Sequence, residues 1–489
     1  MKTVVSGLIA GAVALGAGPA AGADPSQEAA ASPGEAEVAF DDATVLAIRA
    51  GRVLVRPGVS VEGAVVLVRD GVIEAVGSEL EVPEGARVIE GAVCCAGFID
   101  PWSALGLDAS VLGDQSTDAA TRTADGLDPY GVDHLLAEAL AAGVTSVRLQ
   151  GGQAAAVGGL GAVVRLDPQL SATEALVNDE ADIAMAVGLS VDGGMQLVQL
   201  PDGSYSMISG ARAVDPFDRL SQVERVVSKI EEGRSYLEAQ VEYRHELEAW
   251  ELGIAEKLKE SEKDFKKAKK ARDKKVAEAE EEGEEYKEKK YKEDKKPKKP
   301  KFDAEKEALS LIADGVVPLV VEVHRTAEIR NLLAMTARFN RLRLVIAGGS
   351  EALHAAEQLA ERKVPVIVWP SLRGTERFDE FDGAGLELAG ELAGRGGSVL
   401  LGSGGRDGSV TRDLPLLAAL TVSHGFGREA AFEALTLGAA TTFDLAHRLG
   451  SVEAGKDADL LVLDGDPLDT TARVRHVICG GREVVHQED

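Results

Sequence analysis

The sequence of 489 residues has little aromatic content, at 4%, and only three cysteines. A core with so few rings must be built mainly from Ala, Val and Leu. Three cysteines cannot all pair, and neighbouring cysteines rarely bridge each other. We therefore expect Cys94, Cys95 and Cys479 to be buried as small apolar side chains. A bridge from Cys94 or Cys95 to Cys479 is the alternative for an oxidising compartment.

Positive charge is also in short supply, with 53 Lys and Arg against 81 Asp and Glu, which gives a net charge of -28. A chain this acidic repels phosphate, so we expect no nucleic-acid partner. The length is ample for one large domain with an accessory domain and a sizeable core.

Long apolar runs are confined to the start of the chain. Residues 1–23 hold one basic residue, Lys2, then an apolar stretch and the small residues Ala21-Gly22-Ala23. This pattern predicts a signal peptide, with a buried apolar helix as the alternative. Residues 24–41 are rich in Ala, Ser, Glu and Pro and predict a flexible leader. We expect an exported protein, periplasmic or extracellular, with no membrane span.

The central part of the chain alternates apolar strand patterns with amphipathic helix patterns. VVPLVVEVH precedes the helical RTAEIRNLLAMTARF, and RLRLVIAGG precedes the helical SEALHAAEQLAER. This alternation over residues 96–448 predicts an α/β fold, a (β/α)₈ TIM barrel. Residues 42–95 and 449–489 instead show short β-branched runs and turn signals, such as Asp70-Gly71 and Gly480-Gly481. They predict a small β-sandwich domain that both ends of the chain build together.

Residues 222–305 interrupt this pattern because they become almost entirely Lys and Glu. Leu247, Trp250, Ile254 and Leu258 are spaced three and four apart, so the first part should pack one face of a helix. The part after Phe265 should be an exposed helix with charge pairs, or partly disordered. We interpret the segment as a solvated, coiled-coil-like charged helical insertion, with a helix that docks a partner as the alternative.

Several motifs resemble the amidohydrolase superfamily, in particular its imidazolonepropionase-like branch. They are RLGSVEAGKDADLLVLDGDPLD (residues 448–469), the opening RDGVIEAVG and AGFID runs, and GVTSVRLQGGQAAAVGGLGAVVRL (residues 143–166). The resemblance covers nearly all of the chain after residue 41 except the charged insertion. It implies a metal-dependent barrel that hydrolyses C–N or related bonds of small molecules. A zinc or similar ion would activate water at the carboxyl ends of the strands.

The resemblance also says where the metal ligands should be. The first histidine pair falls on Trp102 and Ala104, the strand-five histidine on Glu322, the strand-six histidine on Gly348 and the strand-eight aspartate on Gly404. The strand-four ligand has its nearest match at Ala184. Indole, methyl and glycine cannot bind a metal ion. We therefore predict no catalytic residue, no metal ligand and no cofactor.

Polar residues should still gather at the mouth of the barrel. The candidate pocket consists of Asp100, Trp102, Ser103, Glu322, His324, Arg325, Ser403 and Arg406, with Glu351 and Asp407 nearby. Glu322 and His324 share a strand face, where they either fill a vacated pocket as a hydrogen-bonded pair or act as an acid–base or chelating pair. The other histidines show no ligand spacing. No Gly-x-Ser-x-Gly or phosphate-loop motif suggests another enzyme class.

These features predict an exported, catalytically silent binding or partner subunit, a pseudoenzyme. It would take a small-molecule ligand and form a homodimer, or a heteromer with an active paralogue. The alternative is a hydrolase of C–N bonds in small amides, peptides or cyclic imides that uses Glu322 and His324. A third hypothesis makes the charged insertion a docking element at the cell envelope.

Overall fold

A computed structural model describes residues 45–107, 111, 114, 116–128, 133–151, 155–188, 195–199, 205–209, 216–253, 262–281, 295–372, 385–404 and 408–487. The predicted signal peptide and leader lie outside these residues, and so does Arg406. The domain boundaries drawn from the sequence remain predictions.

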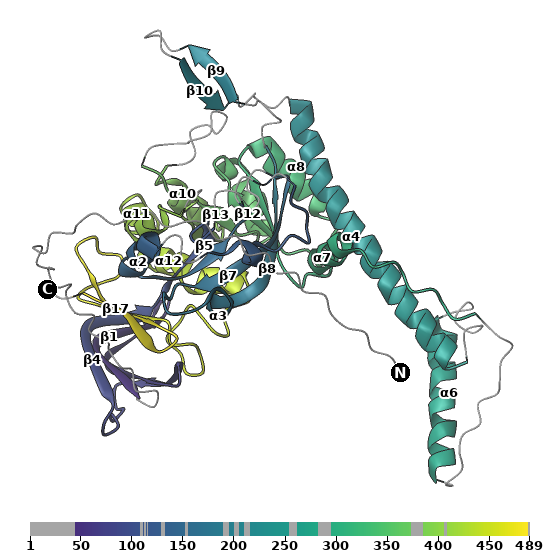
Figure 1. The fold of residues 1–489 in the computed structure, drawn as a ribbon, viewed down its shortest axis with the longest axis horizontal. Helices are drawn as coiled ribbons and strands as arrows, with labels where there is room; N and C mark the ends of the chain where they lie inside the picture. The colour runs from purple at the N-terminus through teal and green to yellow at the C-terminus, as the bar shows by residue number, and fades with distance from the viewer. Residues whose placement is uncertain are drawn as a thin grey trace, which may run out of the picture. The chain divides into compact units, whose positions relative to one another are not determined.

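An eight-stranded sheet forms the centre of the fold, in the order β14-β13-β12-β11-β8-β7-β6-β5 (Figure 1). Its strands are β5 (Phe98–Ser103), β6 (Val144–Leu149), β7 (Val157–Arg165), β8 (Leu176–Ala186), β11 (Leu319–Val323), β12 (Leu344–Gly348), β13 (Val366–Val368) and β14 (Val399–Leu401). The two end strands meet through side chains. Ser403, just after β14, donates from its backbone N–H to Asp100 Oδ1 of β5 at 3.0 Å. The sheet is therefore a nearly closed barrel.

The barrel departs from the expected regular alternation at β7, which runs antiparallel to both β6 and β8. Only residues 150–156 separate β6 from β7. A parallel connection needs a crossover of about a dozen residues or more, so this short link forces the chain to reverse. The other neighbouring strands pair in parallel.

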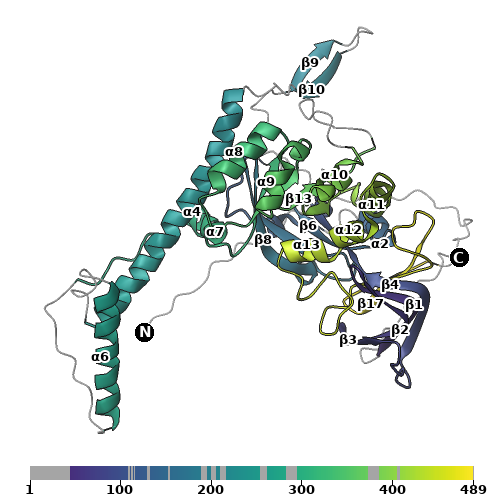
Figure 2. The same ribbon diagram turned by 180° about the vertical axis from the view of Figure 1, so that it is seen from behind.

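Helices cover the outside of the barrel, as Figure 2 shows for α8 to α10. They are α2 (Asp133–Ala141), α3 (Ala172–Ala175), α7 (Ala304–Asp314), α8 (Thr326–Thr336), α9 (Ala356–Glu361), α10 (Leu388–Gly394), α11 (Leu414–Ser423), α12 (Arg428–Leu435) and α13 (Leu437–Thr442), with short 3₁₀ turns η1 (Thr123–Gly126), η2 (Ala352–Ala355) and η3 (Thr411–Asp413). Strand side chains alternate between two layers. In β11, Leu319 and Val321 pack in the outer core, whereas Val320 packs inside the barrel with Ile367 and Leu400.

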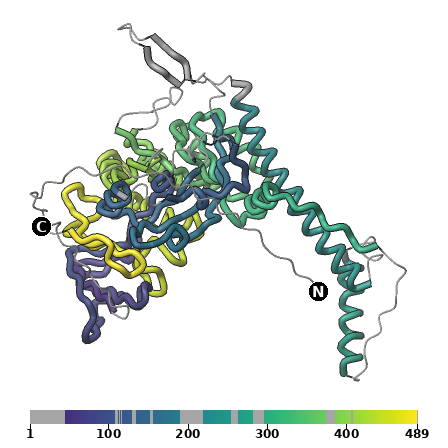
Figure 3. The backbone as a smooth tube through the Cα atoms, viewed as in Figure 1, coloured from purple at the N-terminus to yellow at the C-terminus, as the bar shows by residue number. Residues whose placement is uncertain are grey.

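A seven-stranded sheet takes strands from both ends of the chain, in the order β17-β16-β15-β4-β1-β2-β3. Its strands are β1 (Leu46–Arg56), β2 (Val59–Arg69), β3 (Val72–Gly77), β4 (Arg87–Ala96), β15 (Leu460–Leu463), β16 (Val474–Cys479) and β17 (Arg482–His486). Figure 3 shows the purple and yellow ends of the tube side by side there. One face of the sheet packs against the barrel helices, since Cys95 and Leu461 share a core with Leu140. Its description as a sandwich remains a prediction.

The two predicted hairpin turns have the positive φ angles that favour glycine. Asp70 and Gly71 have φ values of 50° and 78°, and Gly480 and Gly481 have 54° and 80°. These angles are those of the tight turn that matches the twist of antiparallel strands. The turn chemistry was therefore visible in the sequence.

The charged segment contains two long helices, α4 (Pro216–Glu251) and α6 (Glu262–Glu281). The first turns of α4 belong to the barrel core, where Val223, Val227 and Ile230 are buried with Leu309 of α7. The buried ring of Phe265 on α6 meets His245 of α4 edge to face, with centroids 4.4 Å apart. Further along α6 most residues are exposed, as the run of Lys and Glu indicates.

The expectation for the three cysteines is met. Cys94, Cys95 and Cys479 are free and buried, and burial raises the pKa of the Cys94 thiol to about 12. Thiols of this kind are unreactive, which favours the packing role. Within the described residues, the helices are too short or too polar to cross a bilayer. A separate hairpin, β9 (Met195–Gln199) and β10 (Tyr205–Ser209), completes the strands.

Candidate functional site

The carboxyl end of β5 forms a buried polar junction with β14. Asp100 is fully buried, and its Oδ1 accepts hydrogen bonds from the backbone N–H groups of Trp102 and Ser403, both at 3.0 Å. Its Oδ2 accepts from Thr411 Oγ1 at 3.2 Å, and that hydroxyl also lies 2.8 Å from Ser103 Oγ. Ser403 Oγ donates back to the carbonyl of Trp102. Asp100 therefore joins the two end strands of the barrel.

Burial determines how Asp100 titrates. Desolvation raises the pKa of its carboxyl to about 6, and the hydrogen bonds from Ser403, Trp102 and Thr411 oppose this rise. An acid with a pKa near 6 changes charge close to neutral pH, which is useful for proton transfer. Both of its oxygens accept hydrogen bonds from backbone N–H groups or from Thr411, so this carboxylate stabilises the junction of the two strands.

A buried ion pair spans the barrel interior between β6 and β8. The Arg148 and Asp182 side chains are both 0% exposed, and Arg148 Nε donates to Asp182 Oδ1 at 2.8 Å. A second donation runs from Arg148 Nη2 to Asp182 Oδ2. Burial raises the pKa of the Asp182 carboxyl, and the guanidinium opposes this effect. The bidentate geometry provides the pairing that a buried charge requires.

The guanidinium of Arg148 also covers an aromatic ring. Its Cζ lies 4.7 Å from the centroid of the Trp102 ring, which is within the range of a cation–π contact. Gly161 makes room for the pair, because a Cβ there would lie 2.3 Å from Asp182 Oδ1. The Arg148–Asp182 ion pair therefore lies inside the barrel, next to the first expected ligand position.

Trp369, which follows β13, connects the β5 side of the mouth to the β11 side. Its ring lies 5.8 Å from that of Trp102 and 5.3 Å from that of His324, centroid to centroid. His324 Nδ1 lies 2.7 Å from Ser350 Oγ, and His324 Nε2 lies 3.7 Å from Glu322 Oε1. The hydrogen bond of the histidine is therefore made with Ser350, whereas the expected pair with Glu322 is a close contact of ion-pair length. Trp102, Glu322 and His324 are all at most 5% exposed.

The two glycines at expected ligand positions face these rings directly. A Cβ on Gly348 would lie 2.3 Å from Cε1 of His324, and one on Gly404 would lie 2.7 Å from Cγ of Trp369. Real Cβ atoms do not approach so closely, and both glycines also have positive φ, at 82° and 63°. The His324 and Trp369 rings occupy the space next to the backbone at both positions.

The structure brings most of the predicted pocket residues together. Asp100, Trp102, Ser103 and Ser403 share one hydrogen-bonded junction, and Trp369 connects it to His324 and thus to Glu322. Arg325 is half-buried and is the residue that precedes α8. Glu351 caps the same helix by accepting from the N–H of Thr326 at 2.8 Å.

Other predicted positions contribute only apolar surface or cannot be judged. Ala104 and Ala184 are buried methyl groups. Arg406 and Asp407 lie outside the described residues. Among the residues that the structure describes, no group of three potential metal ligands occurs at the barrel mouth, and the group that does occur lies on the β16–β17 hairpin.

The sequence interpretation missed four residues that shape this site. Arg148 and Asp182 lie inside apolar strand patterns, where the sequence interpretation considered only the strands. A single charged residue inside an apolar strand nevertheless indicates a buried ion pair. Trp369 closes a strand that was predicted correctly. Ser350 follows β12 and gave no signal of its own, because its role depends on the neighbouring strand.

The comparisons agree with this architecture. The model of the amidohydrolase family matches residues 401–485, from the last residue of β14 through the helices after it to the closing strands. An amidohydrolase from Thermotoga maritima MSB8 is 25% identical, with a TM-score of 0.65 over 90% of this chain and 100% of that one. The chain is therefore similar to the amidohydrolase family in sequence over residues 401–485, and to an amidohydrolase in fold over most of its length.

Another solved structure aligns less well with this chain. Ochratoxinase from A. niger is 16% identical, with a TM-score of 0.48 over 91% of this chain and 96% of that one. Among curated proteins, none matches the chain.

Proposed function

We propose that this amidohydrolase-superfamily chain has lost its metal ligands and acts as a catalytically inactive subunit that binds a small molecule or a partner protein. The proposal includes export, which depends on the N-terminal pattern alone. The observation that carries it is the filling of the barrel mouth by protein side chains. The side chains at the expected ligand positions do not fit a divalent ion.

Three features of the mouth support the loss. Indole and methyl groups stand where the first histidine pair is expected, at Trp102 and Ala104. The rings of His324 and Trp369 lie against the glycines at the strand-six and strand-eight positions. The Arg148 guanidinium lies beside Trp102 and binds both oxygens of Asp182, so that carboxylate is not free to bind a metal ion.

Hydrolysis assays with added metal test this proposal. The purified chain is incubated with small amides, dipeptides and cyclic imides, with and without Zn²⁺ or Mn²⁺. We expect no turnover above that of buffer containing the same ion. Hydrolysis that depends on the ion and is abolished by EDTA would overturn the proposal.

Ligand binding is tested separately with the tryptophans of the mouth as reporters. Trp250 on α4 is the third tryptophan, so Trp250→Phe leaves only Trp102 and Trp369. A small molecule that binds at the mouth should change the fluorescence of this variant saturably. A partner protein that binds elsewhere should leave it unchanged.

A second function has one specific observation in its favour. The imidazole of His324 lies between a hydroxyl and a carboxylate: its Nδ1 is 2.7 Å from Ser350 Oγ, and its Nε2 is 3.7 Å from Glu322 Oε1. A hydroxyl, an imidazole and a carboxylate in this order can activate the hydroxyl as a nucleophile. Such a hydrolase of C–N bonds would need no metal. All three residues are at most 5% exposed, so a substrate would have to open the mouth to reach them. Ser350→Ala should abolish any metal-independent hydrolysis, and activity that survives would exclude this mechanism.

A further inference from the structure

The C-terminal hairpin brings two histidines together on one face of the terminal sheet. His476 of β16 and His486 of β17 are register partners in the antiparallel pair. Directly opposed residues of such a pair point to the same side of the sheet. Their rings lie 4.6 Å apart, centroid to centroid.

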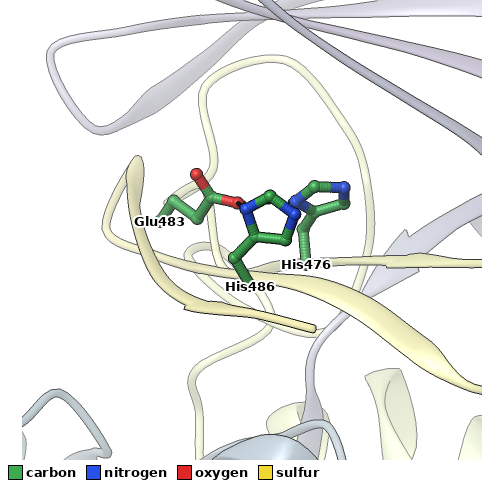
Figure 4. A group of neighbouring side chains, drawn as sticks. All are labelled: His476, Glu483 and His486. Atoms are coloured by element: carbon green, nitrogen blue, oxygen red, sulfur yellow. Dashed lines mark hydrogen bonds and ion pairs between the residues drawn. The ribbon is translucent and has the colours of Figure 1, made fainter. Parts of the chain in front are cut away.

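Glu483 of β17 points its carboxylate at both rings (Figure 4). Its Oε1 lies 2.6 Å from Nδ1 of His476 and 3.9 Å from Nδ1 of His486. One potential ligand atom from each of the three residues lies within 4.8 Å of the other two. The other oxygen, Oε2, pairs with the Arg87 guanidinium at the start of β4. Arg87 therefore fixes the carboxylate and leaves Oε1 facing the imidazoles.

The degree of exposure suits a site that an ion can enter from solvent. The Glu483 side chain is 7% exposed and that of His476 is 16% exposed, whereas that of His486 is 55% exposed. Packing therefore holds the side chains of Glu483 and His476 in place, whereas that of His486 faces solvent. Two ligands held in place and one exposed ligand can surround an ion with little rearrangement.

We propose that His476, Glu483 and His486 bind a divalent transition-metal ion of the zinc class. Two imidazole nitrogens and one carboxylate oxygen are a ligand set that zinc accepts at about 2.0–2.2 Å. Oxygen-only ions such as Mg²⁺ and Ca²⁺ are disfavoured by the two nitrogens. The ion takes the position between His476 Nδ1 and Glu483 Oε1, the neutral imidazole of His476 carries its proton on Nε2, and water completes the coordination.

The ion would fasten the edge of the terminal sheet. Among the described strands, β17 is the last in the sheet order, with β16 as its one neighbour. Binding at this site ties β17 to β16 and, through Glu483 and Arg87, to β4. An ion that binds only the folded chain raises the unfolding temperature with its concentration. This site is independent of the barrel and of the proposed loss of hydrolysis.

Zinc binding to the full chain tests the proposal, by competition with a chromophoric chelator. We expect one tight Zn²⁺ per chain, and Co²⁺ in the same site should give the visible absorption of a site with nitrogen and oxygen ligands. His486→Ala removes an exposed ligand and should fold normally. It should weaken Zn²⁺ binding by at least about a hundredfold, since even outer-shell changes at metal sites cost about 10- to 100-fold.

His424→Ala is the matched control. His424 is also exposed, at 38%, and lies 3.8 Å from the Glu387 carboxylate, but it lacks a second histidine opposite. It should leave Zn²⁺ affinity unchanged. Glu483→Gln should weaken binding, and zinc should raise the thermal midpoint of the parent but not of His486→Ala.

Each contrary result has a defined meaning. No zinc on the parent chain, or equal affinity in His486→Ala, would overturn this site and leave the proposed function intact. Zinc that disappears with Glu322→Gln combined with His324→Gln, but survives His486→Ala, would place the ion in the barrel. That result would overturn both the hairpin site and the loss of the barrel metal.

Discussion

Replacing Arg148 by methionine is the perturbation whose effect the structure specifies best. Arg148 and Asp182 are both fully buried and doubly hydrogen-bonded, and Arg148 Nη2 also donates to Gln150 Oε1 at 2.5 Å. Arg148→Met keeps an unbranched apolar stem and removes the charge. Asp182 is then left buried without its counter-ion, which costs about 3–5 kcal/mol of unfolding free energy.

The pH dependence of this loss has a definite sign. Burial raises the pKa of Asp182, and without Arg148 nothing opposes that rise. When the pKa of an acid is higher in the folded than in the unfolded state, the free energy of unfolding falls as pH increases through the folded pKa. The loss of stability in Arg148→Met should therefore be smaller at acidic pH, where Asp182 is protonated, than at alkaline pH.

Urea unfolding followed by far-UV circular dichroism measures both effects. Combining Arg148→Met with Asp182→Leu removes the whole pair, and most of the lost stability should return because an apolar pair no longer carries an unpaired charge. Arg412→Met is the control, since the Arg412–Glu138 pair is on the surface, with side chains 46% and 43% exposed, and should matter little. A single-variant loss below about 1 kcal/mol would refute the reasoning. So would a double variant as unstable as Arg148→Met.

Three further predictions concern the mouth and the long helices. Asp100→Asn removes a carboxyl whose pKa is raised from 3.8 to about 6. The free energy of unfolding of this variant should therefore increase relative to that of the parent as pH rises through about 6, by up to about 3 kcal/mol. A pH-independent difference in urea unfolding would contradict this. Gly348→Ala should lose about 2–4 kcal/mol through its clash with His324 and its positive φ. Gly85→Ala, with φ of 83° and open space, should show only the backbone part of that loss in the same assay, about 1–2 kcal/mol. Deleting residues 262–281 should leave the main calorimetric transition unchanged, since Phe265 is the only buried hydrophobic residue among the described side chains of α6. A lowered midpoint would show that α6 supports the barrel.

The sequence predicted the strand and helix alternation well because each element of the barrel has an apolar period. It also predicted the two hairpin turns, since glycine and Asp-Gly pairs determine the backbone angles locally. The reversal of β7 was missed, although the short link of residues 150–156 is visible in the sequence and excludes a helical crossover.

The candidate site was predicted by position more than by chemistry. Trp102 and Glu322 were placed correctly at the ends of strands, but their contacts depend on how distant strands meet. The clash of Gly348 with His324 and the bridge made by Trp369 are properties of packing between strands, which no local pattern encodes. The hairpin histidines were passed over because their spacing of ten residues in the sequence matches no ligand motif, and only the strand register makes them neighbours.

The most direct test of the filled barrel is anomalous diffraction at the zinc edge from a crystal of the full chain soaked in Zn²⁺. The account predicts a peak beside His486 on the hairpin and none at the mouth between Trp102, His324 and Trp369. An anomalous peak at the mouth, within bonding distance of protein side chains, would contradict it.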